Sequence, residues 1–446
     1  MELEQQLINV FEGLRRVGLR NRLRRLDWIV LLLATATPVV LHAQVAGIQT
    51  EAADWPTYNR DLAGTRYSPL TQINTENVGS LRQVWSYPLG RNHTTGDLGG
   101  GSQFTPLVID GVMYLAGADH VVALQADTGA EIWRFNLREG APSRRGLAYW
   151  PGDGENPAMV LITAGQQLLA IIPEEENSTS RTMPVAYAGA PVIFENLLLV
   201  GSNTPPGSVR AFDLRSESEA WVFHSTPGPG EVGHDTWENN AWQNQPNLFH
   251  WAFSLTVDTE RGLVFAAFES AGPGDYYGGD RPGNNLFSDS IVALDVRTGE
   301  RRWHYQTVHH DIWDFDLPAA PGLLDVEIEG ELVPLLALAG KTGYLYILNR
   351  ETGEPVFGIE ERAVPQSNAP GEQSSPTQPI PIKPPPIAKV DFAAEDIVTA
   401  EDTTEAHAAF CRRIYEENGG FSNDGPFTPY GYHEPRSEVS STIIFP

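Results

Sequence analysis

A hairpin-like repeat constrains the fold of this chain more than any other feature of its sequence. The segment 123–133, ALQADTGAEIW, returns at 293–303 as ALDVRTGERRW, and weaker copies occupy 211–221 and 347–357. Each copy predicts a strand, a tight turn with its Gly at the tip in the better copies, and a second strand that ends in an aromatic residue. Glycine suits that tip because it readily adopts the positive φ that such a turn requires. The repeat therefore predicts an all-β fold.

The spacing of these units indicates the architecture. Their closing aromatic residues are separated by one or two steps of roughly 40–50 residues, the length of one four-stranded propeller blade. These residues are Trp85, Trp133, Trp221, Trp303 and Phe357. A degenerate strand at 166–172 marks a unit inside one of the longer gaps. The short apolar strands and the abundance of glycine (42) and proline (34) exclude a helical solenoid of similar period. We predict a β-propeller of four-stranded blades, about six to seven of which are visible.

The first 43 residues have the composition of an export signal. Six arginines precede an apolar run at 28–41, which ends in Leu41-His42-Ala43, a small-residue cleavage pattern. The run is shorter than the roughly 20 apolar residues that a membrane span needs. Residues 1–43 are therefore predicted to be a signal peptide, with an uncleaved N-terminal anchor as the alternative, and residues 44–446 to be the propeller.

Charge and cysteine content exclude several functions. A net charge of −27 repels phosphate backbones and excludes a nucleic-acid partner. The single cysteine, Cys411, rules out a disulfide within the chain, a Cys-x-x-Cys-His haem site and a cysteine-ligated iron–sulfur cluster. Any redox chemistry must use a cofactor that is held without thiolates.

The region from about 360 to 440 breaks the repeat. Eight prolines between 365 and 386 indicate an extended strip on the surface. A short helix is predicted from about 404 to 417, because acidic residues precede it and Gly419-Gly420 ends it. We expect this insertion to cover one face of the propeller and to help close an active-site funnel.

Several motifs outside the repeat resemble the pyrroloquinoline quinone (PQQ) dehydrogenases, especially the glucose- and polyol-dehydrogenase-like branch of bacterial periplasms. The resemblance runs from DWPTYNRDLAGTRYSP at 54–69 through YGGDR at 277–281 and TVHHDIWDFD at 307–316 to FTP at 427–429. Because cofactor-free propellers share the hairpin repeat, the motif HHDIWDFD carries most of the specificity. The resemblance implies an eight-bladed propeller that oxidises an alcohol, sugar or polyol by hydride transfer to PQQ.

Asp314 is the catalytic residue that this resemblance implies. A base must remove the hydroxyl proton while hydride passes to the quinone, and the aspartate after the tryptophan of the motif has that role in the family. A cation near the quinone, Ca²⁺ or another divalent or lanthanide ion, would polarise the carbonyl, and oxygen ligands suit it. The alternative for Asp314 is a turn carboxylate that caps backbone amides.

The resemblance also implies the residues around this base. The candidates for PQQ contacts are Lys341, Trp251 and Gln103: a cation for the quinone oxygens, a flat floor for stacking and an amide for a cofactor carboxylate. The candidate metal ligands are Asp314, Asn203 and Asp316, with Glu269 behind them. Asp316 is similar to a signature of lanthanide use in the methanol branch, although the glucose branch also carries it. His309 and His310 are interpreted as residues that brace the Asp314 loop rather than as a metal pair.

Three departures from the family pattern are visible. The adjacent cysteines of the methanol branch are absent, and Ala118-Asp119-His120 replaces a common Gly-Asn-Arg, which alters a cation contact to the cofactor. In relatives a further segment and at least one blade follow the equivalent of 444–446, so the resemblance implies a sequence that is truncated at its C-terminus.

Two functional hypotheses follow. The first is a periplasmic quinoprotein dehydrogenase, soluble or attached to the inner membrane by its N-terminal segment, that passes electrons to a membrane quinone or cytochrome c. The second is a non-catalytic propeller scaffold or an inactive truncated relative. The sequence does not identify the substrate.

Overall fold

The computed structural model describes residues 54–90, 104–137, 142–143, 145–173, 177–187, 189–202, 204–244, 255–272, 276–417, 420, 423 and 425–430. The chain divides into two compact units, Met1–His42 and Ala43–Pro446, and every described residue belongs to the second. The predicted leader lies outside the described residues. Within the described ranges, no helix has both the length and the apolar character needed to cross a membrane.

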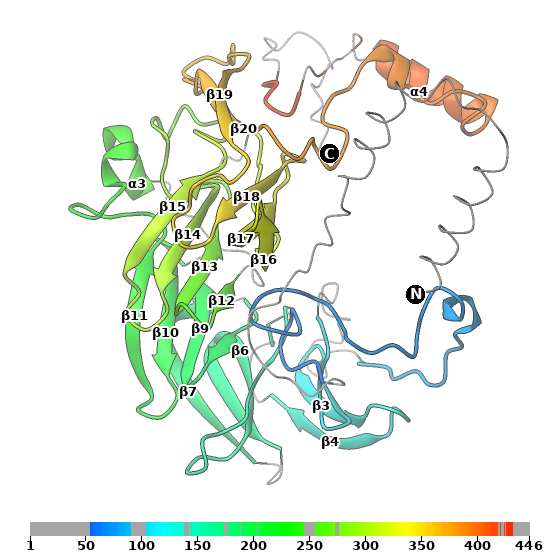
Figure 1. Cartoon of the computed structure of the whole chain (residues 1–446), viewed down its shortest axis with the longest axis vertical. Helices are drawn as coiled ribbons and strands as arrows, with labels where there is room; N and C mark the ends of the chain where they lie inside the picture. Colours follow the sequence, from blue (N-terminus) through cyan, green and yellow to red (C-terminus); the bar gives the residue numbers. More distant parts are fainter. Residues whose placement is uncertain are drawn as a thin grey trace, which may run out of the picture. The chain divides into compact units, whose positions relative to one another are not determined.

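The described part of the chain is built from antiparallel sheets whose strands follow one another in sequence order (Figure 1). Three sheets have four strands: β1 (Leu107–Ile109), β2 (Val112–Ala116), β3 (His120–Gln125) and β4 (Glu131–Asn136); β8 (Val192–Phe194), β9 (Leu197–Ser202), β10 (Ser208–Asp213) and β11 (Ser218–His224); β12 (Thr256–Asp258), β13 (Leu263–Ala267), β14 (Ser290–Asp295) and β15 (Arg301–Gln306). Two have three strands: β5 (Ala148–Trp150), β6 (Met159–Ile172) and β7 (Asn177–Tyr187); β16 (Gly322–Ile328), β17 (Glu331–Ala339) and β18 (Leu345–Asn349). The last sheet is the pair β19 (Ile359–Ala363) and β20 (Thr377–Pro381). The prediction of an all-β fold is confirmed, and three of these six sheets have the four strands predicted for a propeller blade.

Helices are few and short in the described ranges of the chain. They are the 3₁₀ turns η1 (Val78–Ser80), η2 (His234–Thr236), η3 (Glu238–Asn240) and η4 (Ala394–Asp396), and the α-helices α3 (Ala241–Asn244) and α4 (Glu405–Glu417). Helix α4 lies where the sequence predicted a helix from about 404 to 417.

The repeat corresponds to the outer hairpin of the four-stranded sheets. In each full copy the alanine at its start pairs with the tryptophan at its end: Ala123 with Trp133, Ala211 with Trp221 and Ala293 with Trp303. A register shift follows that pair at the same place in all three hairpins. The three similar sequences therefore adopt the same hairpin conformation, including the same register shift.

The fourth copy, 347–357, departs from the prediction. Its turn is formed, but the second strand is reduced to a single bridge between Leu348 and Pro355. Proline has no N–H to continue a β-ladder, so the hairpin ends there. The prediction of a complete second strand in this copy was wrong.

Tryptophans link successive units across their turns. Each indole N–H donates to the carbonyl three residues before the glycine of the next turn: Trp85 to Ala126 (3.2 Å), Trp221 to Val296 (3.0 Å) and Trp303 to Arg350 (3.0 Å). A Cβ atom on Gly129, Gly299 or Gly353 would lie 2.6–2.7 Å from a carbon of the corresponding indole. The glycine is therefore needed for its positive φ and for the close approach of the preceding unit.

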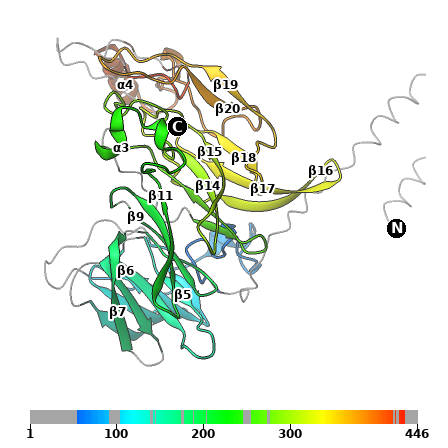
Figure 2. The same ribbon diagram turned by 90° about the vertical axis from the view of Figure 1, so that its left-hand side faces the viewer.

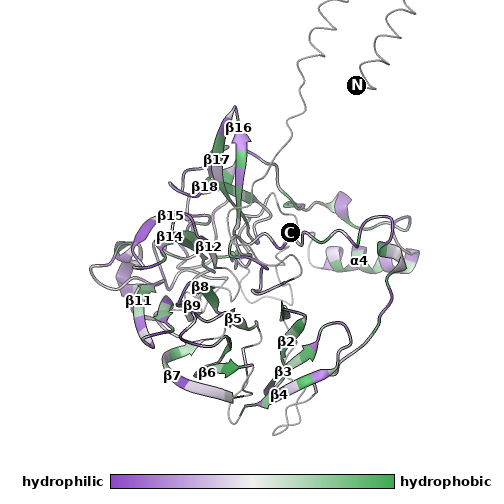
Figure 3. Ribbon diagram, turned by 60° about the horizontal axis from the view of Figure 1, so that its bottom comes forward, coloured by the Kyte–Doolittle hydropathy of each residue, from purple (hydrophilic) through white to green (hydrophobic). Residues whose placement is uncertain are grey.

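Apolar clusters continue this packing from sheet to sheet. Buried side chains of β1–β4 pack with those of β5–β6, β6–β7 with β9–β10, β8–β10 with β12–β14, and β13–β14 with β16–β18. Figures 2 and 3 show the sheets following one another in this order. The sheets β5–β7, β8–β11 and β12–β15 thus each pack against the preceding and the following sheet.

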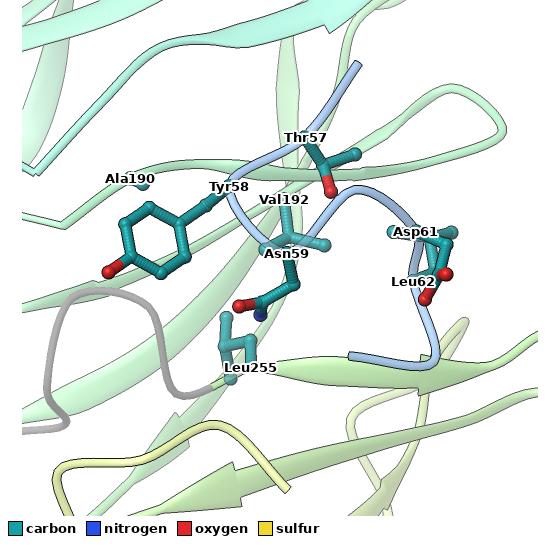
Figure 4. A pocket seen from close by; sticks show the side chains of 8 residues that line it. All are labelled: Thr57, Tyr58, Asn59, Asp61, Leu62, Ala190, Val192 and Leu255. Atoms are coloured by element: carbon teal, nitrogen blue, oxygen red, sulfur yellow. The ribbon is translucent and has the colours of Figure 1, made fainter. Parts of the chain in front are cut away.

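The segment 54–66 bonds to the first strand of each of three sheets. Trp55 forms a bridge with Val108 of β1, the Val257 N–H of β12 donates to the Leu62 carbonyl (2.7 Å), and the Leu323 N–H of β16 donates to the Ala63 carbonyl (2.9 Å). A cavity of about 10 Å³ lies beside the segment, room for roughly one water molecule. Figure 4 shows its lining, which includes Tyr58, Asn59, Val192 and Leu255. This segment connects sheets that are distant in sequence.

Candidate active site

The motif HHDIWDFD lies in the connection between β15 and β16. Trp313 and Phe315 are fully buried, with ring centroids 5.7 Å apart, and both rings pack against Phe427, at 5.5 and 5.8 Å. Asp314 lies between these two anchored residues, and its side chain is 22% exposed. The two buried rings thus hold a half-buried carboxylate in a fixed loop.

Lys341 joins the two aspartates of the motif. Its Nζ lies 2.8 Å from Asp314 Oδ2 and 2.6 Å from Asp316 Oδ2. Lys341 comes from the turn between β17 and β18, and its N–H donates to the Asp316 carbonyl (3.1 Å). Burial opposes the charged form of Lys341, but its hydrogen bonds to Asp314 and then to Asp316 outweigh burial and raise the pKa of the lysine. Lys341 is therefore a charged ammonium beside both carboxylates.

Ser270 contacts both aspartates from the other side. Its N–H and its hydroxyl donate to Asp316 Oδ1 at 2.9 and 3.1 Å, and the hydroxyl also lies 3.3 Å from Asp314 Oδ1. The Asp316 side chain is only 4% exposed. Both of its oxygens are thus engaged, one by Ser270 and the other by Lys341.

Asp311 caps the backbone of the same loop. Its Oδ1 accepts the Trp313 N–H at 2.8 Å and its Oδ2 accepts the Phe315 N–H at 2.7 Å. Burial raises the pKa of Asp311 to about 7, although these two backbone hydrogen bonds and the charge of Arg281 lower it. Asp311 is a buried structural carboxyl group directly behind Asp314.

Asp289, at the start of β14, completes a buried acidic group. No described residue makes a hydrogen bond of good geometry to either carboxylate oxygen, and the residue is fully buried. Burial raises its pKa well above the usual value, and the charges of Asp311 and Asp316 add to this effect. Arg281, itself buried, acts in the opposite direction. Asp289 therefore favours its neutral form.

His309 and His310 both contact the insertion. The backbone N–H and carbonyl of His309 bond to the Gln378 side chain at 2.8 and 2.7 Å. His310 Nε2 lies 2.8 Å from Glu372 Oε1 in a buried pair, and its Nδ1 lies 2.8 Å from the Gly283 carbonyl. These contacts agree with the interpretation of the histidines as braces. In the ranges that the structure describes, no group of three His, Cys, Asp or Glu side chains could hold a metal ion.

The structure brings together part of the predicted site. Asp314, Lys341 and Asp316 are in contact, whereas Gln103, Asn203 and Trp251 lie outside the described residues. The Glu269 carbonyl accepts the Asp289 N–H at 3.1 Å, which places Glu269 near the same loop. His120 is fully buried in β3, with Nδ1 3.1 Å from Asp119 and Nε2 3.3 Å from Arg134.

Sequence reasoning missed three residues here: Ser270, Asp289 and the role of Arg281. All three lie in the connection between β13 and β14, and the pairing of β14 with β15 brings that connection to the motif, which follows β15. The one signal available was Asp289, an acidic residue placed directly before the apolar run of β14.

The predicted cofactors can be tested against these side chains. A charged lysine beside a half-buried carboxylate matches a quinone that gains negative charge and a hydroxyl that loses its proton. For a metal, Asp314 and Asp316 supply oxygens of the preferred type. However, Lys341 already contacts both, and the described residues offer no third acidic or histidine ligand. The described residues fit the quinone and do not by themselves complete a metal site.

Comparison with known proteins is consistent with this chemistry. The sequence model described as "PQQ: Glucose/ethanol/alcohol dehydrogenase, beta-propeller domain" matches residues 55–175 and 173–446. The quinoprotein glucose dehydrogenase of Escherichia coli (strain K12) is 32% identical over 465 residues, which cover 93% of this chain and 55% of the relative. A quinohemoprotein alcohol dehydrogenase of Pseudomonas putida is 32% identical, over 82% of this chain and 55% of the relative.

A solved structure of a quinohemoprotein dehydrogenase has a similar fold. The quinohemoprotein alcohol dehydrogenase from Comamonas testosteroni is 27% identical, with a TM-score of 0.60 over 74% of this chain and 52% of that chain. The chain spans about half the length of the curated relatives it matches.

Proposed function

This chain belongs to the PQQ-dependent dehydrogenases, and from that membership we propose that it oxidises an alcohol, sugar or polyol with Asp314 as the general base. When bound, PQQ supplies the carbonyl that accepts the substrate's hydride. The relatives named for glucose and for alcohol support this range of substrates.

The contact between Lys341 and Asp314 is the observation that carries the proposal. To act as the base, Asp314 must be ionised, and an ammonium 2.8 Å from its Oδ2 is matched to that charge. Because the Lys341 side chain is 27% exposed, its ammonium charge can also act on an oxygen that becomes negative as the cofactor is reduced. Asp314 would hold the substrate's proton, and Lys341 would stabilise charge on both partners.

Ca²⁺ or another divalent or lanthanide ion is proposed beside Asp314. Asp314, with Asn203 and Asp316, would provide the oxygen ligands, and the carboxylate chemistry of the two aspartates supports the choice of a hard cation. Electrons would pass to a membrane quinone or cytochrome c in the periplasm, where residues 1–43 would direct the chain or attach it to the inner membrane.

Reconstitution of the purified chain with PQQ and Ca²⁺ tests the proposal. We expect bound-quinone absorbance and dye-linked oxidation of at least one substrate among glucose, glycerol and a primary alcohol. Asp314→Asn should lower turnover by about 10²-fold or more with quinone binding retained, because the variant lacks the base. Asp295→Asn, in the β14–β15 hairpin turn at the opposite end of β14 from Asp289, is the control for the loss of one carboxyl group.

Two results would contradict the proposal. If Asp314→Asn left turnover unchanged, Asp314 would not be the base. If the wild-type chain neither bound quinone nor oxidised any substrate, the alternative of a non-catalytic scaffold or inactive relative would replace the enzyme hypothesis.

A further inference from the structure

The backbone of Asp314 adopts a conformation that needs support. Its φ is +65°, and that of His310 is +47°, both in the left-handed region. For a residue with a Cβ, the left-handed conformation is about 1–2 kcal/mol less stable than the right-handed one. Such conformations persist only where neighbouring groups fix them. The side-chain direction of Asp314 depends on this backbone, so whatever fixes the φ also aims the carboxylate.

The carboxylate of Asp311 provides that support. It accepts the N–H of Trp313 at 2.8 Å and the N–H of Phe315 at 2.7 Å, which are the residues on either side of Asp314. One rigid planar group therefore spans the left-handed residue and holds the peptide groups that flank it. We infer that Asp311 is a positioning residue, which fixes the backbone of Asp314 so that its carboxylate faces the reacting hydroxyl. This inference rests on the proposed function of Asp314.

Asp311 is itself firmly placed. It is fully buried, and its carbonyl accepts a hydrogen bond from the buried guanidinium of Arg281. Arg281 is fixed in turn by Asn285, with Nη1 3.0 Å from Asn285 Oδ1. On the other side, the preceding His310 pairs with Glu372 of the insertion (2.8 Å), and Glu372 also accepts the Gly278 N–H (2.6 Å). The support for Asp314 thus extends from sheet β12–β15 to the segment between β19 and β20.

Asp311→Asn tests the inference, because it keeps the size of the side chain but replaces one acceptor oxygen by an NH₂ group. That group cannot accept the second backbone N–H. Since Asp311 is fully buried, it touches neither substrate nor solvent. We expect kcat per quinone-loaded site to fall about 10–100-fold, as for a small misplacement of a reacting group. The KM for the substrate and the Kd for PQQ should stay within about 2-fold.

Asp258→Asn is the matched control. Asp258 is also fully buried, and one of its oxygens accepts two backbone N–H groups, those of Glu260 and Arg261, at 3.1 and 3.0 Å. It lies at the end of β12 and contacts none of the site residues. Asp258→Asn should lower stability and leave kcat per loaded site unchanged. The comparison distinguishes the general effect of removing a buried carboxylate that binds backbone amides from a specific displacement of Asp314.

Hydrogen exchange provides a second readout that does not depend on turnover. In Asp311→Asn, the peptide that covers 311–316 should exchange at least about 10-fold faster, because one of the two amides held by Asp311 loses its acceptor. In Asp258→Asn the increase should be confined to the peptide around 258–261. Unchanged exchange at 311–316, or an unchanged kcat per loaded site, would overturn the positioning role.

Two further arms keep the outcome unambiguous. If Asp311→Asn does not fold, Glu372→Gln weakens the outer support through His310 and should give the same pattern with a smaller, about 3–10-fold, fall in kcat. Unchanged kcat and exchange in that variant would overturn the inference. If the wild-type chain binds PQQ without any turnover, the proposed function fails, and hydrogen exchange alone decides whether Asp311 holds Asp314.

Discussion

At the scale of single side chains, the aspartates around Asp314 outnumber the cations that lie close to them. Asp289, Asp311 and Asp316 lie behind Asp314, and Lys341 and Arg281 are the cations that act on them. Lys341 contacts the two aspartates nearest to the surface, whereas Asp289 has no hydrogen bond of good geometry from any described residue. Four aspartates thus face two cations, and protonation of Asp289 reduces this excess of negative charge, which is the direction in which burial shifts the pKa of Asp289.

This arrangement predicts a pH-dependent stability that Asp289→Asn should remove. An unfolded aspartate ionises near pH 4, whereas buried Asp289 keeps its proton to higher pH. The folded state then binds the extra proton, so the free energy of unfolding falls as the pH rises from about 4 through the raised pKa. Asp289→Asn should flatten this fall and stabilise the protein at pH 8 by about 1–3 kcal/mol.

Urea unfolding at pH 5 and pH 8 checks this prediction. The exposed Asp127→Asn is the control for loss of one carboxyl group and should change stability by less than about 0.5 kcal/mol. Equal stability of wild type and Asp289→Asn at both pH values would contradict the prediction, because the ionisation of Asp289 would then have no effect on the free energy of unfolding.

The sequence was informative for the part of the site that one motif encodes. Asp314 and Asp316 belong to a single loop, and Lys341 follows 27 residues after Asp314, at the end of the strand pair that leaves that loop. Ser270 and Asp289 could not be predicted, because they reach the loop only through the pairing of β13, β14 and β15 in one sheet. Their chemistry depends on burial, which no local pattern in the chain expresses.

At the scale of secondary structure, the tip glycines of the hairpins have two functions. Gly299 has a φ of +72°, and a Cβ on it would lie 2.7 Å from the Trp221 indole. Gly299→Ala should therefore lower the free energy of unfolding by about 2–3 kcal/mol. This loss is the sum of the cost of the left-handed conformation for alanine and the cost of displacing the Trp221 ring.

Gly111→Ala is the matched control for that prediction. Its φ is +76°, but a Cβ there would meet nothing within 4 Å, so only the conformational cost of about 1 kcal/mol should appear. Chemical unfolding followed by tryptophan fluorescence measures both variants. Equal losses in the two variants would show that contact with the indole is not part of the glycine's role.

The repeat predicted the strands well where each turn is followed by a residue that can continue the ladder. It was wrong at 347–357, where Pro355 follows the turn, and it revealed only one strand of the β5–β7 sheet, at 166–172. In that sheet β6 runs from Met159 to Ile172, with a register shift at Gly165 that has no counterpart in the repeat. Local similarity predicts hairpins, but strand lengths and bulges follow from the neighbouring sheet.

For the whole molecule, the segment 54–66 connects sheets that the chain order keeps apart. Gly64 lies in it with a φ of +73°, and a Cβ there would lie 2.6 Å from the Pro321 carbonyl oxygen and 2.8 Å from Thr256 Cγ2. A side chain at this position must push the segment away from two sheets at once. Gly64→Ala should therefore lower stability by about 2–4 kcal/mol and reduce the cooperativity of unfolding.

Cooperativity can be measured by comparing urea transitions seen by tryptophan fluorescence and by far-ultraviolet circular dichroism. The two transitions should coincide for wild type and for the control Gly90→Ala, whose Cβ would meet nothing within 4 Å. They should separate for Gly64→Ala. Coincident transitions in that variant would indicate that the sheets remain coupled without the segment.

The contact between each tryptophan and the turn that follows it also has a direction along the chain. Trp85, Trp221 and Trp303 are each synthesised before the turn that receives them. As the protein emerges from the ribosome, a newly completed unit therefore lacks the surface that covers its last indole. During translation, the last tryptophan of each of these units thus stays uncovered until the next turn is made. A chaperone that binds exposed aromatic side chains would find a target at each of these stages.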